Sequence, residues 1–148
     1  MFPKASVFPK PVPLLLPNTA AYESQPMVKP TGFREYDARW LFEKEINLMG
    51  VQALGLGLAA LLHEMGVKPE VVTGHDFRAY SGAIKQALTV GLMAGGAGVH
   101  DIGLALSPIA YFAQFQLDVP AVAMVTASHN DNGWTGVKMG ARPTGRCP

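Results

Sequence analysis

Apolar residues recur along the middle of the chain with the spacing of helices, every three or four residues, in three separate segments. The segment 46–66 predicts a helix that ends at Gly66, a residue suited to the position after a helix. The segment 81–96 predicts a second helix with Ser81 as its N-terminal cap. The segment 107–117 predicts a third, capped by Ser107 and with Pro108 at its first helical position. The predicted apolar faces are Leu54, Leu58, Leu61, Leu62 and Met65 in the first helix and Ile84, Ala87, Leu88, Gly91 and Leu92 in the second.

Short apolar runs lie between these helices and predict buried strands within 70–78, 97–103 and 121–128. Alternating strands and helices indicate an α/β domain with a largely parallel sheet and helices on its faces. Gly50, Gly55 and Gly57 weaken the first helix by up to about 1 kcal/mol each relative to alanine. We therefore expect that helix to press closely against a flat neighbour such as the sheet.

The two ends of the chain differ from this alternating region in amino-acid composition. Residues 1–30 contain seven of the twelve prolines, and proline fixes φ and removes a hydrogen-bond donor. We expect an extended or disordered arm over 1–30 and a structured domain over 31–140. The ending GARPTGRCP does not resemble a strand, so residues 141–148 are assigned to an atypical tail.

Charge and composition exclude several classes of partner. The formal net charge is +1, and no basic stripe interleaved with aromatic residues is present, so we expect no nucleic-acid partner. The longest apolar stretch, 48–62, is shorter than the roughly 20 residues of a membrane span, and no signal peptide is recognisable, so we expect no membrane partner. Cys147 is the one cysteine, which favours a cytoplasmic location.

Polar residues follow the predicted strands at the edge where parallel sheets bind ligands. Asp76 and Arg78 follow the first strand, and Ser128 and His129 follow the third. This placement suits a nucleophilic serine, although spacing alone favours a turn-forming serine and a structural histidine in a loop rich in Asn, Asp and Gly. The G-x-S-x-G motif of hydrolases is absent.

Two further features concern anions and metals. Arg34 and Arg39 lie on either side of Tyr36 and Asp37. Arginine can bind a phosphate through two hydrogen bonds, so the pair could form an anion site. The alternative is an ordinary cluster of solvated charges. The four histidines show no metal-binding spacing. Residue types alone therefore indicate a soluble α/β domain with polar strand ends, and an unrelated ligand-binding domain of this class stays open.

Three motifs, in order along the chain, resemble those of the α-D-phosphohexomutases, the family of phosphoglucomutases and phosphomannomutases. FREYDAR at 33–39 resembles the family's F-R-x-Y-D-I-R-G opening, and GHDFRAYSG at 74–82 resembles its G-R-D-x-R-x-S-G stretch. TASHN at 126–130, followed by GVKMG at 136–140, resembles the active-site signature. The loop HNDNGWTGVK is similar to that of the bacterial phosphomannomutase/phosphoglucomutase branch.

The resemblance implies a three-layer α/β/α domain with a mostly parallel, mixed sheet and the catalytic serine of a phosphohexomutase. Ser128 would be phosphorylated, would donate the phosphoryl group, and would bind Mg²⁺ through its phosphate. Hexose 1-phosphate and hexose 6-phosphate would interconvert through a hexose 1,6-bisphosphate. Lys138 and Arg39 match the family's active-site lysine and arginine, and both are expected on loops. His129 and Asn130 would shape the loop and approach the substrate. The other candidate substrate- or phosphate-binding residues in the matching motifs are Arg34, Tyr36, Asp76 and Arg78.

This sequence also departs from the family pattern. Ala38, Trp40 and His75 stand where the motifs usually have Ile, Gly and Arg. The match covers only the first of four domains: the D-G-D-x-D-R metal loop, the G-E-x-S-G sugar-reading loop and the last phosphate-binding loop, which belong to domains II–IV, are absent. We therefore expect a truncated or frameshifted product, whose alternative role is that of an inactive fragment or a phosphoacceptor and interaction module. The preference between glucose and mannose stays open.

Overall fold

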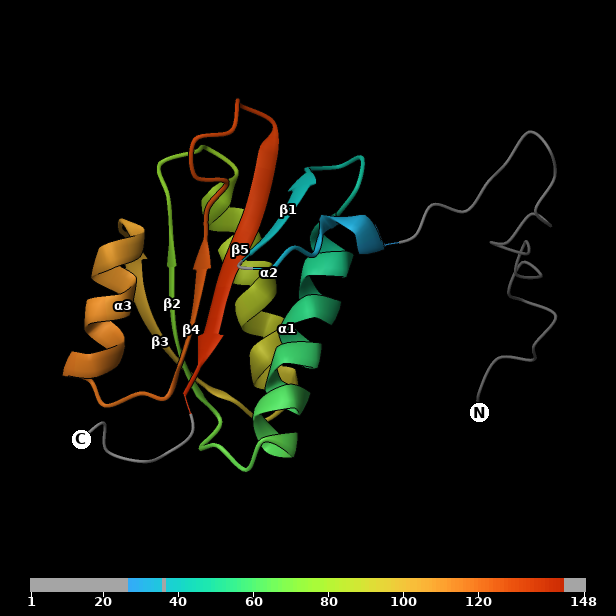
Figure 1. Cartoon of the computed structure of the whole chain (residues 1–148). Helices are drawn as coiled ribbons and strands as arrows, with labels where there is room; N and C mark the ends of the chain where they lie inside the picture. Colours follow the sequence, from blue (N-terminus) through green and yellow to red (C-terminus); the bar gives the residue numbers. More distant parts are fainter. Residues whose placement is uncertain (1–26, 36, 143–148) are drawn as a thin grey trace, which may run out of the picture.

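Five strands form one sheet in the order β1-β5-β4-β2-β3, and helices cover both of its faces (Figure 1). The computed structural model describes residues 27–35 and 37–142. Within them, no helix is both long and apolar enough to cross a membrane. In chain order, the elements are the 3₁₀ helix η2 (Pro30–Gly32), β1 (Ala38–Leu41), α1 (Leu48–Glu64), β2 (Glu70–His75), α2 (Ser81–Ala94), β3 (Gly98–Leu104), α3 (Ser107–Gln116), β4 (Ala121–Val125) and β5 (Trp134–Ala141).

The sheet is mixed because one strand runs against the others. β2 pairs in parallel with both β3 and β4, whereas β5 lies antiparallel between β4 and β1. The prediction that GARP could not belong to a strand was wrong for its first two residues, since Gly140 pairs with Val122 and Ala141 with Ala121. Hydrogen bonding to a neighbour on each side holds β5 extended despite its glycines, because sheet context outweighs intrinsic strand propensity.

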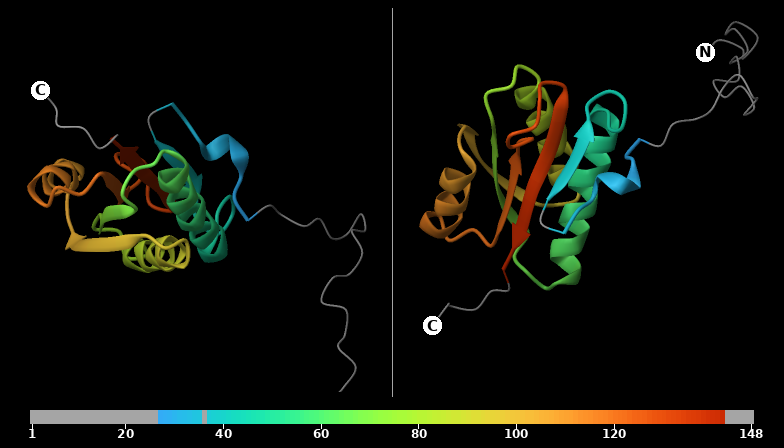
Figure 2. Two further views of the ribbon diagram at one scale, coloured as in Figure 1. Left: turned by 90° about the horizontal axis from the view of Figure 1, so that it is seen from below. Right: turned by 45° about the horizontal axis from the view of Figure 1, so that its top comes forward.

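Two apolar clusters fill the spaces on the two sides of the sheet. The larger cluster joins α1 and α2 to one face, with Leu62 and Leu88 fully buried in it. The smaller cluster joins α3 to the other face through Ala110, Val122 and Met124. Figures 1 and 2 show α3 on the opposite side of the sheet from α1 and α2. The predicted three-layer α/β/α architecture is confirmed.

Two glycines bring α1 close to α2 rather than to the sheet, which corrects the expectation drawn from the sequence. A Cβ atom added to Gly55 would lie 2.4 Å from the main-chain oxygen of Leu88. One added to Gly91 would lie 2.0 Å from the main-chain oxygen of Gln52. The backbones of the two helices therefore touch where these glycines face each other, and Gly57, by contrast, faces open space.

The predicted apolar face of α1 is only half correct. Leu58 and Leu62 are buried, whereas Leu61 and Met65 are among the exposed apolar residues. The helix ends as predicted, with Gly66 in the left-handed region at φ +64° immediately after the last turn. The predicted apolar face of α2 is confirmed, since Ile84, Ala87, Leu88, Gly91 and Leu92 are all buried.

Both predicted serine caps were wrong. Tyr80 occupies the cap position of α2, and the Ser81 hydroxyl donates to the carboxylate of Asp76 at 2.6 Å instead of capping the helix. A hydrogen bond to an ionised carboxylate is roughly twice as strong as one between neutral groups, so the contact with Asp76 sets the orientation of this side chain. In α3, the cap position is Leu106 and Ser107 is the first helical residue, so Pro108 is the second.

The domain begins before the predicted boundary. Lys29 donates its main-chain N–H to the carbonyl of Glu45 at 2.8 Å, and Val28 forms a bridge with Ile46. Residues 27–30, assigned to the arm from the sequence, thus contact the folded region. Residues 1–26 of the predicted arm and 143–148 of the predicted tail lie outside the described residues.

The contact between α1 and α2 gives a test with a matched control. Gly91→Ala should lower the free energy of unfolding by about 1–3 kcal/mol, because its methyl group would overlap the α1 backbone. Gly57→Ala should instead raise it by up to about 1 kcal/mol, because this site is open and alanine favours helix. Urea denaturation followed by circular dichroism measures both, and equal effects of the two substitutions would contradict the packing.

Candidate active site

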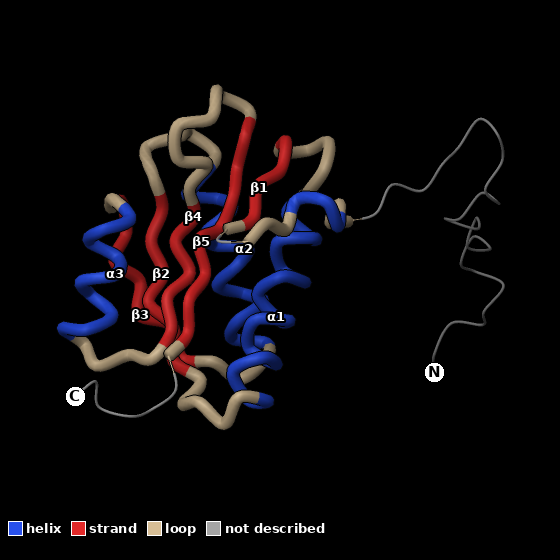
Figure 3. The backbone as a smooth tube through the Cα atoms, in the orientation of Figure 1, coloured by secondary structure: helices blue, strands red, loops and turns tan. Residues whose placement is uncertain are grey.

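The loops that follow β2 and β4 meet at one end of the sheet, beside the start of α3 (Figure 3). They border a cleft of about 420 Å³ that mixes polar and apolar groups. This is the carboxyl end of the parallel strands, where open α/β sheets bind ligands. The cleft is lined by Asp76, Phe77, Ala105, Leu106, Ser107, Pro108, Met124, Thr126, Ser128, His129 and Lys138.

Ser128 lies three residues after β4 and has a left-handed backbone, with φ at +55°. Its N–H donates to the hydroxyl of Thr126 at 2.9 Å, and the N–H of Asn130 closes the turn onto the carbonyl of Ala127 at 3.0 Å. The serine is exposed, and its Oγ lies 3.4 Å from Nδ1 of His129. The turn therefore presents the hydroxyl to the cleft.

Lys138 reaches the same cleft from a strand and not from a loop, so its predicted placement on a loop was wrong. It lies in β5 directly opposite Met124 of β4, and both residues line the cleft. Residues directly opposite each other in antiparallel strands project from the same face of the sheet. This pairing places Lys138 beneath the end of β4, on the side of the sheet that α3 covers.

Arg39 was also predicted on a loop and lies instead in β1. Its guanidinium forms a two-point ion pair with Asp37, through Nε at 2.8 Å and Nη2 at 2.7 Å. Nη1 donates to the side-chain oxygen of Asn130. Arg39 thus connects the edge of the sheet to the Ser128 turn across 91 positions of sequence.

Asp76 and Arg78 are buried beneath this turn. Nη1 of Arg78 pairs with the Asp76 carboxylate. Nη2 of Arg78 donates to the carbonyls of Ser128 and Asn130, at 3.3 and 2.5 Å. The side chains of Asp76 and Arg78 are only 8% and 5% exposed, so these two residues hold the turn from below.

The far end of the same loop is anchored by Tyr80. Its hydroxyl accepts from the N–H of Gly133 and donates to the carbonyl of Trp134, each at 2.8 Å. Its ring stacks on Phe42 with the centroids 5.5 Å apart. One aromatic residue therefore connects α2, β5 and the segment after β1, and it limits the movement of the loop that leads from Ser128 to Lys138.

The structure brings most, but not all, of the predicted residues together. Arg34 is exposed, and its main-chain N–H bonds to the carbonyl of Asp37. No contact among the described residues joins the Arg34 side chain to the Ser128 turn. Tyr36 lies outside the described residues. Of the two arginines predicted to form an anion site, only Arg39 therefore contacts the Ser128 turn.

Sequence reasoning missed Thr126, Tyr80 and the role of Ser81. All three belong to the matching stretches TASHN and GHDFRAYSG, so membership of a motif was the available signal. Each was passed over because threonine, tyrosine and serine are ordinary loop and helix-start residues. Thr126 and Tyr80 contact partners 50 and 54 positions away, Asp76 and Trp134. Ser81 contacts Asp76, five positions before it, through its side chain.

The described residues do not fit a magnesium site of their own. Among residues 27–35 and 37–142, no three His, Cys, Asp or Glu side chains are grouped so that they could hold a metal ion. Asp76 is engaged by Arg78, Ser81 and Thr126. Asp131 is exposed in the loop after Ser128. Mg²⁺ prefers an octahedral set of oxygen ligands, which this arrangement does not supply.

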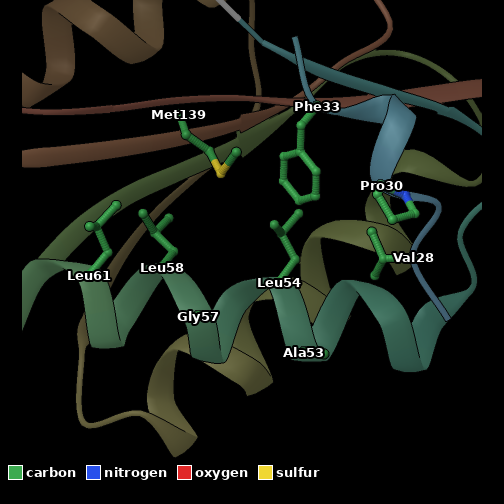
Figure 4. A pocket seen from close by; sticks show the side chains of 9 residues that line it. All are labelled: Val28, Pro30, Phe33, Ala53, Leu54, Gly57, Leu58, Leu61 and Met139. Carbon is green, nitrogen blue, oxygen red and sulfur yellow. The ribbon is translucent and has the colours of Figure 1, made fainter. Parts of the chain in front are cut away.

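A second cavity, of about 430 Å³, lies between α1, β5 and the segment around η2 (Figure 4). Its lining is almost wholly apolar, with Phe33, Leu58 and Met139 facing one another in the view. It offers no side chain that could orient a phosphate, so the cleft at Ser128 is the better candidate. The lining residues are Val28, Pro30, Phe33, Ala53, Leu54, Gly57, Leu58, Leu61 and Met139.

The groups around the Asp76 side chain favour its ionised form. Burial opposes ionisation and alone would raise the pKa of Asp76, but hydrogen bonds from Ser81, the Arg78 N–H and Thr126 outweigh it. The pKa therefore lies below its ordinary value of 3.8. Because folding lowers this pKa, ionised Asp76 stabilises the folded state above that value, and the contribution is lost as the pH falls through the folded-state pKa.

Known proteins resemble this chain in sequence and in structure. A family model described as phosphoglucomutase/phosphomannomutase, alpha/beta/alpha domain I, matches residues 30–146. A phosphomannomutase of Salmonella typhimurium is 40% identical over 121 residues, which are 79% of this chain and 25% of that protein. A protein of Xanthomonas campestris pv. campestris named phosphohexose mutases is 39% identical over 107 residues, covering 72% of this chain and 23% of its own length.

The solved structures agree with these relatives. A phosphoglucomutase/phosphomannomutase family protein of Burkholderia thailandensis superposes with a TM-score of 0.70 at 28% identity, covering 76% of this chain and 26% of that one. The chain thus spans about a quarter of the length of the relatives it matches.

The buried carboxylate predicts a pH-dependent effect on stability. Asp76→Asn should lower the free energy of unfolding at pH 7 by about 3–5 kcal/mol, because it leaves Arg78 buried without its counter-charge. The difference from wild type should narrow as the pH falls below the ordinary value of 3.8 and then through the lower folded-state pKa, where the native carboxylate takes up its proton. Urea denaturation across this pH range measures it. Asp131→Asn, at an exposed position, is the control and should change stability little at either pH.

Proposed function

Since this chain belongs to the phosphoglucomutase/phosphomannomutase family, whose α/β/α domain I it matches, we propose that Ser128 accepts and returns the phosphoryl group during the interconversion of hexose 1-phosphates and hexose 6-phosphates. The observation that carries the proposal is the exposed Ser128 hydroxyl on a left-handed turn at the end of β4. It shares one cleft with His129 and Lys138. The relatives named phosphomannomutase support the class of reaction.

In the proposed step, the oxygen of Ser128 attacks a phosphorus atom of a hexose 1,6-bisphosphate. The bond from phosphorus to the serine oxygen forms, the bond from phosphorus to the sugar oxygen breaks, and a hexose monophosphate leaves. The serine proton passes to His129, whose Nδ1 lies 3.4 Å from the hydroxyl oxygen. Phosphorylated Ser128 then transfers its phosphoryl group to the free hydroxyl of a hexose 1-phosphate: the bond from phosphorus to that sugar oxygen forms, the bond to the serine oxygen breaks, and a proton returns to the serine. The resulting 1,6-bisphosphate gives its 1-phosphoryl group back to Ser128 and leaves as hexose 6-phosphate, which completes the interconversion.

The cations around the turn would stabilise the charge of the transferring group. Lys138 presents an ammonium group to the cleft, and fixed positive charge on phosphoryl oxygens is a principal source of rate in such transfers. Arg39 holds the Asn130 side chain beside the turn. Asp76 and Arg78 support the turn from below, so we assign them support of the turn in place of contact with the substrate.

A second candidate function follows from the small fraction of the relatives' length that this chain covers. It spans about a quarter of their length, and its described residues offer no grouped acidic side chains for Mg²⁺. We propose that full turnover belongs to a longer protein that adds domains II–IV, their magnesium ligands and their contacts to hexose phosphates. The chain by itself would then serve as the phosphoacceptor domain.

The proposal is tested by labelling the serine directly. Incubation with glucose 1,6-bisphosphate should add one phosphate to Ser128, located by intact-mass and peptide mass spectrometry. Lys138→Met, which keeps much of the side-chain volume and removes the charge, should slow labelling by about 10²–10³ without changing the melting temperature. Ser128→Ala is the control and should take up no phosphate. Phosphate on a different residue in that variant would refute the assignment.

Because this chain spans about a quarter of its relatives' length, we also expect it to lack full activity when purified. The purified chain should bind Mg²⁺ only weakly and should not convert glucose 1-phosphate to glucose 6-phosphate, because positioning of both reactants supplies roughly 7–11 kcal/mol of the barrier reduction in such reactions. Isothermal titration with MgCl₂ and a coupled dehydrogenase assay measure the two properties. Clear turnover that disappears in Ser128→Ala would show that the domain is sufficient alone.

A further inference from the structure

We propose that Thr126 is a positioning residue that locks Ser128 in its left-handed conformation, acting together with the buried Asp76 network, which we define as Asp76, Arg78, Ser81 and Thr126. The inference rests on the proposed function of Ser128 for its catalytic meaning. Its structural part, the lock on the backbone, can be tested without that function.

The hydroxyl of Thr126 makes two hydrogen bonds of opposite sense. It donates to a carboxylate oxygen of Asp76 at 2.9 Å and accepts from the N–H of Ser128 at 2.9 Å. A hydroxyl has one proton to donate, and an ionised carboxylate can only accept. Asp76 therefore fixes the direction of the Thr126 proton, and a lone pair of the same oxygen is left facing the N–H of Ser128.

The other side of Ser128 is held by the same network. Nη1 of Arg78 is paired with Asp76. Nη2 then donates to the carbonyls of Ser128 and Asn130. The peptide groups before and after Ser128 are thus both bonded to residues that contact one buried carboxylate.

A lock is needed because the conformation is intrinsically unfavourable. Residues with a Cβ atom avoid the left-handed region, and Ser128 occupies it at φ +55° while exposed to solvent. Without the two bonds, the turn would be free to return to ordinary φ values, which would redirect the hydroxyl away from its place in the cleft beside Lys138. Displacement of a reacting group by about 1 Å can cost roughly 10²-fold in rate.

The network is fixed to rigid elements and not to the loop itself. The main-chain N–H of Asp76 donates to the carbonyl of Val125, at the end of β4, at 3.0 Å. Its carboxylate also accepts from the hydroxyl of Ser81, the first residue of α2, and from the N–H of Arg78 at 3.2 Å. Through these hydrogen bonds, β4 and the start of α2 hold the backbone of Ser128 in position.

The experiment compares Thr126→Val with Thr126→Ser in the full chain. Valine keeps the shape of threonine and removes its hydroxyl, whereas serine keeps the hydroxyl. Thr73→Val is the matched control, because Thr73 is fully buried and its hydroxyl has no hydrogen-bond partner among the described residues. Thr126→Ala, which removes the hydroxyl without placing a methyl group against the carboxylate, replaces the valine variant if that variant does not fold.

Two readouts separate the lock from the function. Exchange of the Ser128 amide hydrogen, followed by NMR, should accelerate about fivefold in Thr126→Val, which corresponds to loss of one hydrogen bond of typical net strength. The rate of Ser128 phosphorylation by glucose 1,6-bisphosphate should fall about 10- to 100-fold. Thr126→Ser and Thr73→Val should match wild type in both measurements to within about twofold.

The outcomes are distinct. If wild-type Ser128 takes up no phosphate, the proposed function fails, and the exchange rates alone decide whether the lock exists. If wild-type Ser128 is phosphorylated but Thr126→Val shows wild-type exchange and labelling, the lock is refuted and the proposed function stands. Equal effects of Thr126→Val and Thr73→Val would also refute it, because loss of any buried hydroxyl would then suffice.

Discussion

The buried carboxylate of Asp76 is the interaction on which the geometry of the site depends. It accepts hydrogen bonds from Ser81 and Thr126 and pairs with Arg78. A buried charge is costly unless it is paired and fully hydrogen-bonded. Movement of any of these partners away from the carboxylate would therefore destabilise the folded state. Through them, one acidic side chain joins the start of α2 to the turn that carries Ser128.

The second constraint is the insertion of β5 between β4 and β1. Because β5 runs antiparallel to both neighbours, the chain turns back beside Ser128 and carries Lys138 into the cleft that Ser128 borders. The same arrangement places Arg39 at the edge of the sheet, where it reaches Asn130. A conventional parallel crossover would have needed a helix between the two strands, and the loop joining Ser128 to Lys138 would not have been this short.

Within the matched motifs, exposed residues at the cleft and buried residues that support them are neighbours in sequence. In TASHN, Ser128 and His129 border the cleft as exposed groups, whereas Thr126 is buried and bonded to Asp76. In GHDFRAYSG, Asp76, Arg78 and Ser81 are all buried, and Tyr80 anchors the following loop. A matching motif can therefore combine a few exposed residues at the cleft with buried residues whose contacts hold the turn.

The sequence by itself determined the order of the three helices and of the strands β2, β3 and β4, the three-layer class and the position of Ser128 at a strand end, because these depend on periodicity and on local motifs. It did not predict β1 and β5, the antiparallel part of the sheet. Only the tertiary structure decided that Gly55 and Gly91 pack helix against helix, that Lys138 and Arg39 lie in strands, and that Ser81 bonds to Asp76 instead of capping α2. Each of these depends on a partner supplied by another element of the fold. Local propensity carries no information about that partner, and the energy of the contact outweighs local preference.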